Sequence, residues 1–204
     1  MLGIVDYGSG NLFAFQSIYK LLGVPHMFIR SREHFDLCSH IVLPGVGDYD
    51  ETLRLLSENG FMEILHKCVL QERKFFLGVC VGMQILGSRS EEGSLPGLNW
   101  ISGSVSKISA EGGEGLVRLP HMGWNSLNLI RQSKLMDGID LDKGAYFLHN
   151  YEFIADDPEC VISTVDYSKK ITSIINKDNM YGVQFRPEKS LSNGVLLLKN
   201  FADL

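Results

Sequence analysis

Short apolar runs alternate with amphipathic stretches through the first half of the chain. Runs with the length and composition of buried strands cover 2–5, 26–30, 40–43 and 75–79. Apolar residues then recur at helical spacing over 12–22, 49–56 and 61–70, and a further helix is expected after Gly82. Because strands that alternate with helices build parallel βαβ units, this half predicts an α/β fold with a doubly wound, mainly parallel sheet flanked by helices.

The second half of the chain carries short strand-like segments, joined by turns that contain glycine, aspartate and asparagine. They are 98–108, 123–129, 145–153, 161–165, 171–175 and 181–185. We expect them to add antiparallel strands to the sheet, before a closing helix over 191–201. The stretch 109–120 predicts a loop that is too short for a domain linker. No internal repeat is present, so residues 1–204 are expected to form one domain.

Composition narrows the range of partners and compartments. The 204 residues are 45% hydrophobic with a formal net charge of −5, which argues against nucleic acid or an anionic membrane as partner. MLGIVDYGSGNL has no basic start, and no apolar run reaches about 18 residues, so neither a targeting peptide nor a membrane helix is expected. The cysteines follow no CxxC or Cys/His spacing. We therefore expect a reduced, cytoplasmic protein without metal or cofactor, in which Cys38, Cys68 and Cys160 are inert.

The strongest chemical signal is FFLGVCVGMQIL, in which Cys80 lies between Gly78 and Gly82 at a predicted strand-to-helix corner. The glycines remove Cβ atoms that would clash in a turn sharp enough to expose the sulfur, which is the arrangement of a nucleophile elbow. The following helix N-terminus is expected to favour the thiolate, and the N–H of Val81 to act as an oxyanion-hole donor. The alternative is a buried core cysteine.

Two more segments follow strands at the edge where a parallel sheet forms its ligand crevice. Gly45 and Gly47 let the backbone approach a ligand or turn an N–H inward; a simple left-handed turn is the alternative. After 181–185 come Arg186 and Glu188. A cysteine hydrolase needs a base that an acid orients, and Glu188 fits the acid. Arginine does not release its proton near neutral pH, so Arg186 does not fit the base.

Together these motifs resemble the class I (triad-type) glutamine amidotransferases, and within them the glutaminase subunits that serve a histidine-pathway cyclase. The segments that carry the resemblance run in family order along the whole chain: IVDYGSGNL, LPGVG, GVCVGMQ, SEEG, LPHMGWN, FLHNY, GVQFRPEKS and LLKNF. The resemblance implies hydrolysis of glutamine through a cysteinyl thioester. It also implies that the ammonia passes to a cyclase subunit, a (β/α)8 barrel, within a heterodimer.

The resemblance further assigns roles to individual positions. It implies Cys80 as the nucleophile, Glu188 as the acid of a triad and Arg186 at the place of the catalytic histidine. The residues implied to surround the substrate or complete its oxyanion hole are Gly45, Val46, Gly47, Gln84, Glu92, His149, Asn150 and Tyr151. The family usually has serine or threonine where this chain has Asn150. The residues implied to face the barrel are Trp124, Tyr146 and Lys189.

Arg186 departs from the family pattern and keeps alternatives open. An arginine stabilises a thiolate but does not return a proton to departing ammonia, so hydrolysis is expected to be strongly impaired. Of the six histidines, His121 and His149 lie in the motif segments and are the candidates for a replacement base. The alternatives are the same fold serving a surface-sugar amidination partner, a catalytically silent binding subunit, and a free-standing cysteine peptidase.

Overall fold

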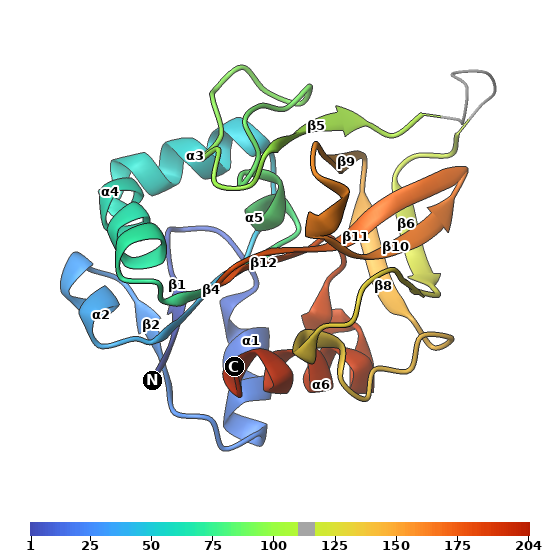
Figure 1. Ribbon diagram of the computed structural model, residues 1–204. Coiled ribbons are helices and arrows are strands. Elements are labelled where there is room, and N and C mark those ends of the chain that lie inside the picture. The colour runs from blue at the N-terminus through green and yellow to red at the C-terminus, as the bar shows by residue number, and fades with distance from the viewer. Residues whose placement is uncertain (110–116) are drawn as a thin grey trace.

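The computed structural model describes residues 1–109 and 117–204 (Figure 1). The helices are α1 Leu12–Leu21, α2 Arg32–Asp36, α3 Tyr49–Glu58, α4 Phe61–His66, α5 Val81–Gln84 and α6 Leu191–Ala202. The strands are β1 Leu2–Val5, β2 His26–Ile29, β3 His40–Leu43, β4 Phe75–Val79, β5 Gly103–Lys107, β6 His121–Asn125, β7 Asn128–Leu129, β8 Ala145–His149, β9 Tyr151–Ala155, β10 Val161–Tyr167, β11 Lys169–Lys177 and β12 Met180–Val183. Shorter helical turns are η1 Lys67–Gln71, η3 Lys134–Met136, η4 Pro158–Cys160 and η5 Pro187–Lys189.

An eight-stranded sheet runs in the order β2-β1-β3-β4-β12-β11-β10-β7. The strands from β2 to β12 are parallel, and β11, β10 and β7 extend the sheet in antiparallel fashion. The predicted α/β sheet with extra antiparallel strands is therefore confirmed. Because the parallel strands end at one edge, the segments after β3, β4 and β12 meet there. These segments carry the 44–47 loop, Cys80 and Arg186.

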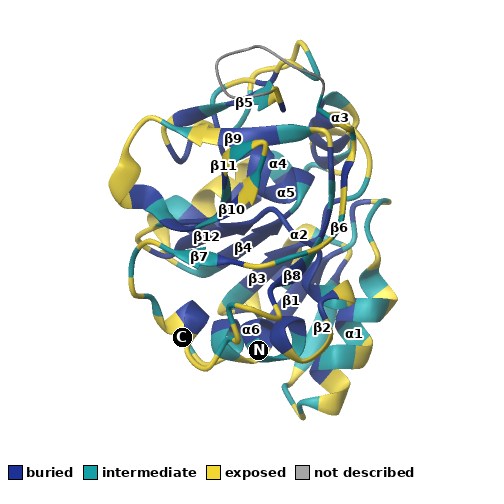
Figure 2. Ribbon diagram, turned by 90° about the vertical axis from the view of Figure 1, so that its right-hand side faces the viewer, coloured by how far each residue is buried: buried dark blue, intermediate teal, exposed yellow. Residues whose placement is uncertain are grey.

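Helices cover both faces of the sheet. In Figure 1, α3, α4 and α5 lie on one side and α1 and α6 on the other. Successive residues of a strand point to opposite faces, so Ile41 and Leu43 of β3 join the core under α3 and α4, whereas Val42 joins the core under α1 and α6. Figure 2 shows the central strands buried between these layers. Strands buried on both faces have continuous apolar sequences, which is why these were readable from the pattern.

Two small antiparallel sheets flank the main one. They show that the single strand predicted over 145–153 is two strands. β8 ends at His149 and pairs with β6, whereas β9 begins at Tyr151 and pairs with β5. The chain thus changes partner at Asn150, because the two halves of the predicted strand bond to different neighbours. The helix α5 contacts β9, so this junction lies beside the corner that carries Cys80.

Several other boundaries also differ from the prediction. Segment 98–108 forms a strand only over Gly103–Lys107, since the N–H groups of residues 98–100 bond to loop carbonyls of residues 85–87. The helix expected over 61–70 ends at His66 and continues as the π-helical turn η1, and the strand expected over 123–129 is divided between β6 and β7. The short helix α2 was not expected; its one buried side chain, Phe35, gives too little periodicity for detection.

Two further expectations concern the loop over 109–120 and membrane-spanning helices. The predicted loop over 109–120 lies mostly outside the described residues. In the described parts of the chain, no helix has the length and apolar character that crossing a membrane requires.

Candidate active site

Cys80 stands on a strained corner between β4 and α5. Its backbone has φ +56° and ψ −113°, a conformation that residues other than glycine rarely adopt. Its N–H donates to Val183 O at 2.8 Å. A Cβ on Gly78 would lie 2.2 Å from Gly82 O, and one on Gly82 would lie 2.5 Å from Leu43 O. Both glycines are therefore required by the close packing of the corner, as the nucleophile-elbow interpretation predicts.

Cys80 opens into a pocket of about 110 Å³ at the edge of the sheet. The residues that line it come from the elbow, the loop after β3, the 88–98 loop and the β8–β9 junction: Gly47, Cys80, Val81, Gln84, Glu92, Leu148, His149, Asn150 and Tyr151. The structure thus gathers most of the predicted substrate-side residues around one sulfur. Arg186, Glu188, Gly45 and Val46 are not among the described residues that line the pocket.

The thiol of Cys80 is not activated in the way that the sequence suggested. Burial raises its pKa to about 11, although the Arg186 charge and the Val81 N–H both act to lower it. The carboxylates of Glu188 and Glu92 raise it further. The Val81 N–H at the start of α5 acts in the predicted direction, but desolvation outweighs it.

Gln184 is a site residue that the sequence analysis missed. Its side chain is fully buried at the end of β12, and Nε2 donates to the Cys80 sulfur at 3.7 Å. Its Oε1 accepts from Gln84 Nε2 at 3.0 Å, and the same Gln84 nitrogen donates to Tyr151 O at 3.2 Å. Both hydrogens of the Gln84 amide are thus engaged, which fixes its orientation at the pocket. A polar residue within the otherwise apolar run 180–185 was the available signal.

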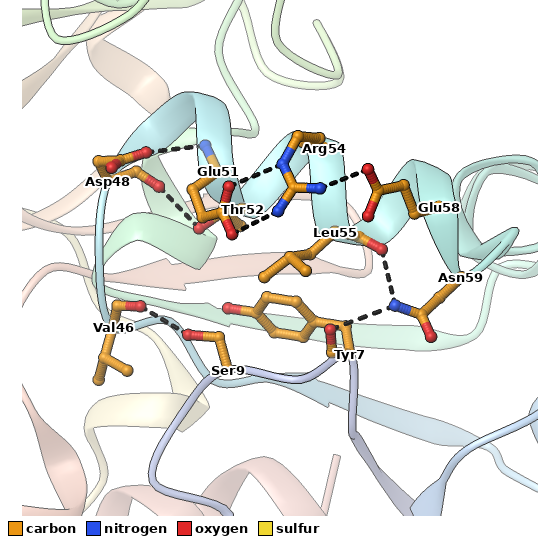
Figure 3. Close-up of polar contacts among 10 residues, drawn as sticks. All are labelled: Tyr7, Ser9, Val46, Asp48, Glu51, Thr52, Arg54, Leu55, Glu58 and Asn59. Carbon is orange, nitrogen blue, oxygen red and sulfur yellow. Dashed lines mark hydrogen bonds and ion pairs between the residues drawn. The ribbon is translucent and has the colours of Figure 1, made fainter.

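The loop after β3 is held from the chain's N-terminal segment. Tyr7 Oη donates to Pro44 O at 2.9 Å, and Ser9 Oγ donates to Val46 O at 2.7 Å, as Figure 3 shows for the latter. Gly47 has φ +114°, a region that favours glycine. A Cβ on Gly45 would lie 2.6 Å from Gly82 N, so this loop packs directly against the elbow. The backbone near Cys80 is therefore built from two neighbouring glycine-containing turns.

Arg186 and Glu188 form a buried ion pair next to the thiol. Nε and Nη2 of Arg186 lie 2.7 Å and 2.6 Å from Glu188 Oε1, and the side chains are 9% and 1% exposed. The Arg186 N–H donates to Tyr146 O at 2.9 Å. Glu188 Oε2 is buried and finds no hydrogen-bond partner among the described residues. The acid of the expected triad is thus in place, but it holds a guanidinium that stays charged near neutral pH.

His149 lines the pocket but both of its ring nitrogens are engaged. Nδ1 lies 2.7 Å from Tyr151 O, and because a carbonyl only accepts, Nδ1 carries the proton of the neutral ring. Nε2 then accepts from Nδ1 of His121 at 3.0 Å. Burial lowers the pKa of both rings to about 4. Neither histidine is therefore placed to replace the base that Arg186 lacks.

The three residues expected at a partner surface come together on one side of the molecule. Trp124 of β6 lies opposite Tyr146 of β8, with ring centroids 6.2 Å apart, and Lys189 Nζ lies 5.8 Å from the Tyr146 ring. Trp124 is 49% exposed. Leu191, which lines the same surface pocket, is 73% exposed. Trp124 and Tyr146 come from paired strands, and Lys189 comes from the short helical turn η5.

Comparison with known proteins identifies the family of the chain. The chain belongs to the family described as glutamine amidotransferase class-I, whose model matches residues 21–203. It is 42% identical to imidazole glycerol phosphate synthase subunit HisH of Leptospira interrogans and 40% identical to that of Leptospira borgpetersenii, each alignment covering 100% of both chains. A solved structure titled glutamine amidotransferase matches 100% of this chain and 99% of its own, with a TM-score of 0.70 and 17% sequence identity. At that identity, the structural match supports the fold alone.

Proposed function

We propose that this chain is the glutaminase subunit of an imidazole glycerol phosphate synthase. It would hydrolyse glutamine and deliver ammonia to a (β/α)8 cyclase subunit that makes imidazole glycerol phosphate and AICAR in histidine biosynthesis. The observation that carries the proposal is Cys80 on its strained corner, at a pocket whose other lining groups suit an amino acid amide. The full-length identity with HisH subunits supports the choice of pathway.

The pocket offers a separate group for each end of glutamine. The Glu92 carboxylate accepts from Tyr49 N–H at 3.1 Å and is the acidic side chain among the lining residues, so it suits the α-ammonium group. The Cys80 sulfur would attack the side-chain amide carbon and release ammonia, leaving a thioester that water cleaves to glutamate. The N–H of Val81 and the Gly47 loop would stabilise the oxyanion of each tetrahedral intermediate.

Proton transfer is the weak step of this mechanism. The Cys80 thiol must lose a proton before attack, and the amide nitrogen of the tetrahedral intermediate must gain one to leave as ammonia. Arg186 supplies neither transfer, and hydrogen bonds occupy both nitrogens of His149. We therefore propose that glutamine binds but that its turnover is at least about 10²-fold slower than at a site with a histidine base.

The Arg186–Glu188 pair also favours a second candidate, a catalytically silent subunit that binds glutamine while free ammonium feeds the partner. Both candidates keep the pocket and the partner surface, and they differ in whether Cys80 reacts with glutamine. Cytoplasmic location, a heterodimer and an ammonia channel between the subunits are parts of the same proposal.

The test uses this chain purified together with a histidine-pathway cyclase barrel. Glutamate release and formation of imidazole glycerol phosphate are measured with glutamine or with an ammonium salt as nitrogen source. We expect activity with ammonium and slow, Cys80-dependent glutamate release, which Cys80→Ser abolishes. Synthesis from ammonium with no glutamate release above the Cys80→Ser background supports the silent subunit. Failure to associate with the cyclase while glutamine still binds overturns the choice of pathway and leaves a surface-sugar amidination partner to be tried. No binding of glutamine overturns the proposal altogether.

A further inference from the structure

The 88–98 loop, which carries Glu92, is fastened to the first turn of α3 by a carboxylate outside the pocket. Asp50 Oδ1 accepts from the backbone N–H groups of Ser94 and Leu95 at 3.1 Å and 3.0 Å. Asp50 Oδ2 accepts from Ser94 N–H at 2.9 Å and from Ser94 Oγ–H at 3.1 Å. Because charge-assisted hydrogen bonds are the strong ones, this cluster holds the loop more firmly than neutral contacts would.

The contact is close as well as polar. A Cβ on Gly93 would lie 2.0 Å from Asp50 Oδ1, and the three atoms nearest to that Cβ all belong to the Asp50 side chain. Position 93 thus leaves room for the carboxylate and joins Glu92 to the anchored residues. Hydrogen bonds from Ser94 and Leu95 also lower the pKa of Asp50, which keeps it ionised.

The same turn of α3 holds Glu92 itself. Tyr49 N–H donates to Glu92 Oε2 at 3.1 Å. In the sequence, Tyr49 lies one residue before Asp50 and two residues after Gly47, which lines the pocket. Asp48, the N-cap of α3, accepts from Glu51 N–H at 2.7 Å and fixes the start of this turn (Figure 3). The first turn of α3 therefore connects two walls of the pocket, and among the described residues Asp50 makes its side-chain hydrogen bonds to the loop beyond Glu92.

We infer that Asp50 is a positioning residue for substrate recognition: it clamps the loop after Glu92 so that the Glu92 carboxylate faces the α-ammonium group of the amino acid. The inference rests on the proposed function, in which Glu92 binds that group. Since Asp50 acts through Glu92 and not on the sulfur, its loss should weaken glutamine binding and leave the reactivity of Cys80 unchanged.

The experiment measures the Kd of glutamine and of 4-carbamoylbutanoate, which lacks the α-amino group, by calorimetry on the full chain. In Asp50→Ala we expect the Kd of glutamine to rise about tenfold, the equivalent of about 1.4 kcal/mol. The Kd of the des-amino analogue should stay within about twofold, because Glu92 has no partner on it. Alkylation of Cys80 by iodoacetamide and the melting temperature should be unchanged. Glu58→Ala, at an exposed carboxylate on the same helix that pairs with Arg54, is the matched control and should bind like the unaltered chain.

Two further variants change the contact between Asp50 and the loop in other ways. Asp50→Asn keeps one acceptor oxygen but places an NH2 group where the other oxygen accepts, so its loss of glutamine affinity should be smaller than that of Asp50→Ala. Gly93→Ala displaces the carboxylate from the other side and should reproduce the loss of Asp50→Ala. The double variant should be no worse than either single one, since both changes break the same contact.

The outcomes are distinguishable. An unaltered chain that does not bind glutamine overturns the proposed function and the inference with it. Glutamine binding that is unchanged in Asp50→Ala, or equal losses for glutamine and the des-amino analogue, overturns the positioning role alone.

Discussion

At the scale of single residues, a site residue could be predicted from the sequence only where its neighbours in the chain determine its geometry. The glycines on each side of Cys80 follow from the geometry of one sharp turn, so the elbow could be predicted from five residues. Gln184 and Asp50 could not, because the partners that define them lie 104 and 44 positions away along the chain. The pKa of Cys80 depends on burial from all sides, so a local argument about one helix end predicts one contribution and not the net shift.

The first prediction concerns Arg186. In Arg186→His, an imidazole N–H can donate to Glu188, whose Oε2 is buried without a described partner, and the other ring nitrogen can serve as the base. We expect glutamine-dependent glutamate release in the complex with the cyclase to rise by at least about 10²-fold. Arg186→Gln, which carries no titratable group, is the control and should not gain activity. Rapid turnover by the unaltered chain, insensitive to the histidine substitution, would mean that another group is the base.

A second prediction concerns the reactivity of Cys80. Because burial raises its pKa to about 11, the rate of alkylation by iodoacetamide should rise with pH towards that value. A glutamine-like diazo-ketone should instead label Cys80 ahead of Cys38, Cys68 and Cys160, which are all buried, since the pocket binds the reagent beside the sulfur. Mass spectrometry of labelled peptides measures this, with added glutamine as the competitor. Equal labelling of the four cysteines would contradict the assignment of the nucleophile.

At the scale of elements, the strands of the parallel half were predictable with their bounds, whereas in the antiparallel half the presence of strands was predictable but several of their bounds and pairings were not. Strands such as 40–43 are buried on both faces, so their apolar runs mark them whatever their neighbours are. The break at Asn150 arises because β8 and β9 bond to different strands, and no pattern within 145–153 contains that information. Strand pairing over long separations is a property of the assembled sheet.

The third prediction belongs to the β6–β8 pair, which places His121 directly opposite His149. Burial lowers the pKa of both from 6.5 to about 4, so between these values the unfolded chain binds more protons than the folded one. The free energy of unfolding should therefore fall as pH drops from 6.5 towards 4, and recover above 6.5. His121→Phe keeps an aromatic ring against Phe147 and Tyr167 and removes one titrating group, so its pH dependence should be shallower.

Urea unfolding across this window measures the effect, with His66→Gln at an exposed histidine as the control. A pH dependence in His121→Phe as steep as in the unaltered chain would assign the loss of stability to carboxyl groups instead. The comparison of slopes is required because carboxylates also take up protons in the lower part of the window.

At the scale of the whole molecule, the pocket and the proposed partner surface lie on adjoining parts of the fold. The carboxyl edge of the parallel strands carries Cys80 and its pocket, whereas the cluster of Trp124, Tyr146 and Lys189 lies on the strands and turn that frame Arg186. Tyr146 links the two through its carbonyl, which accepts from the Arg186 N–H. A subunit bound over this cluster would thus lie next to the segment that holds Glu188, as the proposed delivery of ammonia to a partner requires.

The last prediction tests that surface. Trp124 is 49% exposed and packs edge-on against Tyr146, so truncation removes contact area for a partner and little from the core. In Trp124→Ala we expect association with the cyclase barrel to weaken by about 2 kcal/mol, as for an aromatic interface residue, with the melting temperature of the isolated chain nearly unchanged. Leu37→Ala, at a 62% exposed residue after α2 on the other side of the sheet, is the matched control and should bind normally. Titration calorimetry and thermal unfolding give the two readouts. A large fall in melting temperature would identify Trp124 as a core residue, and unchanged affinity would place the partner on another face.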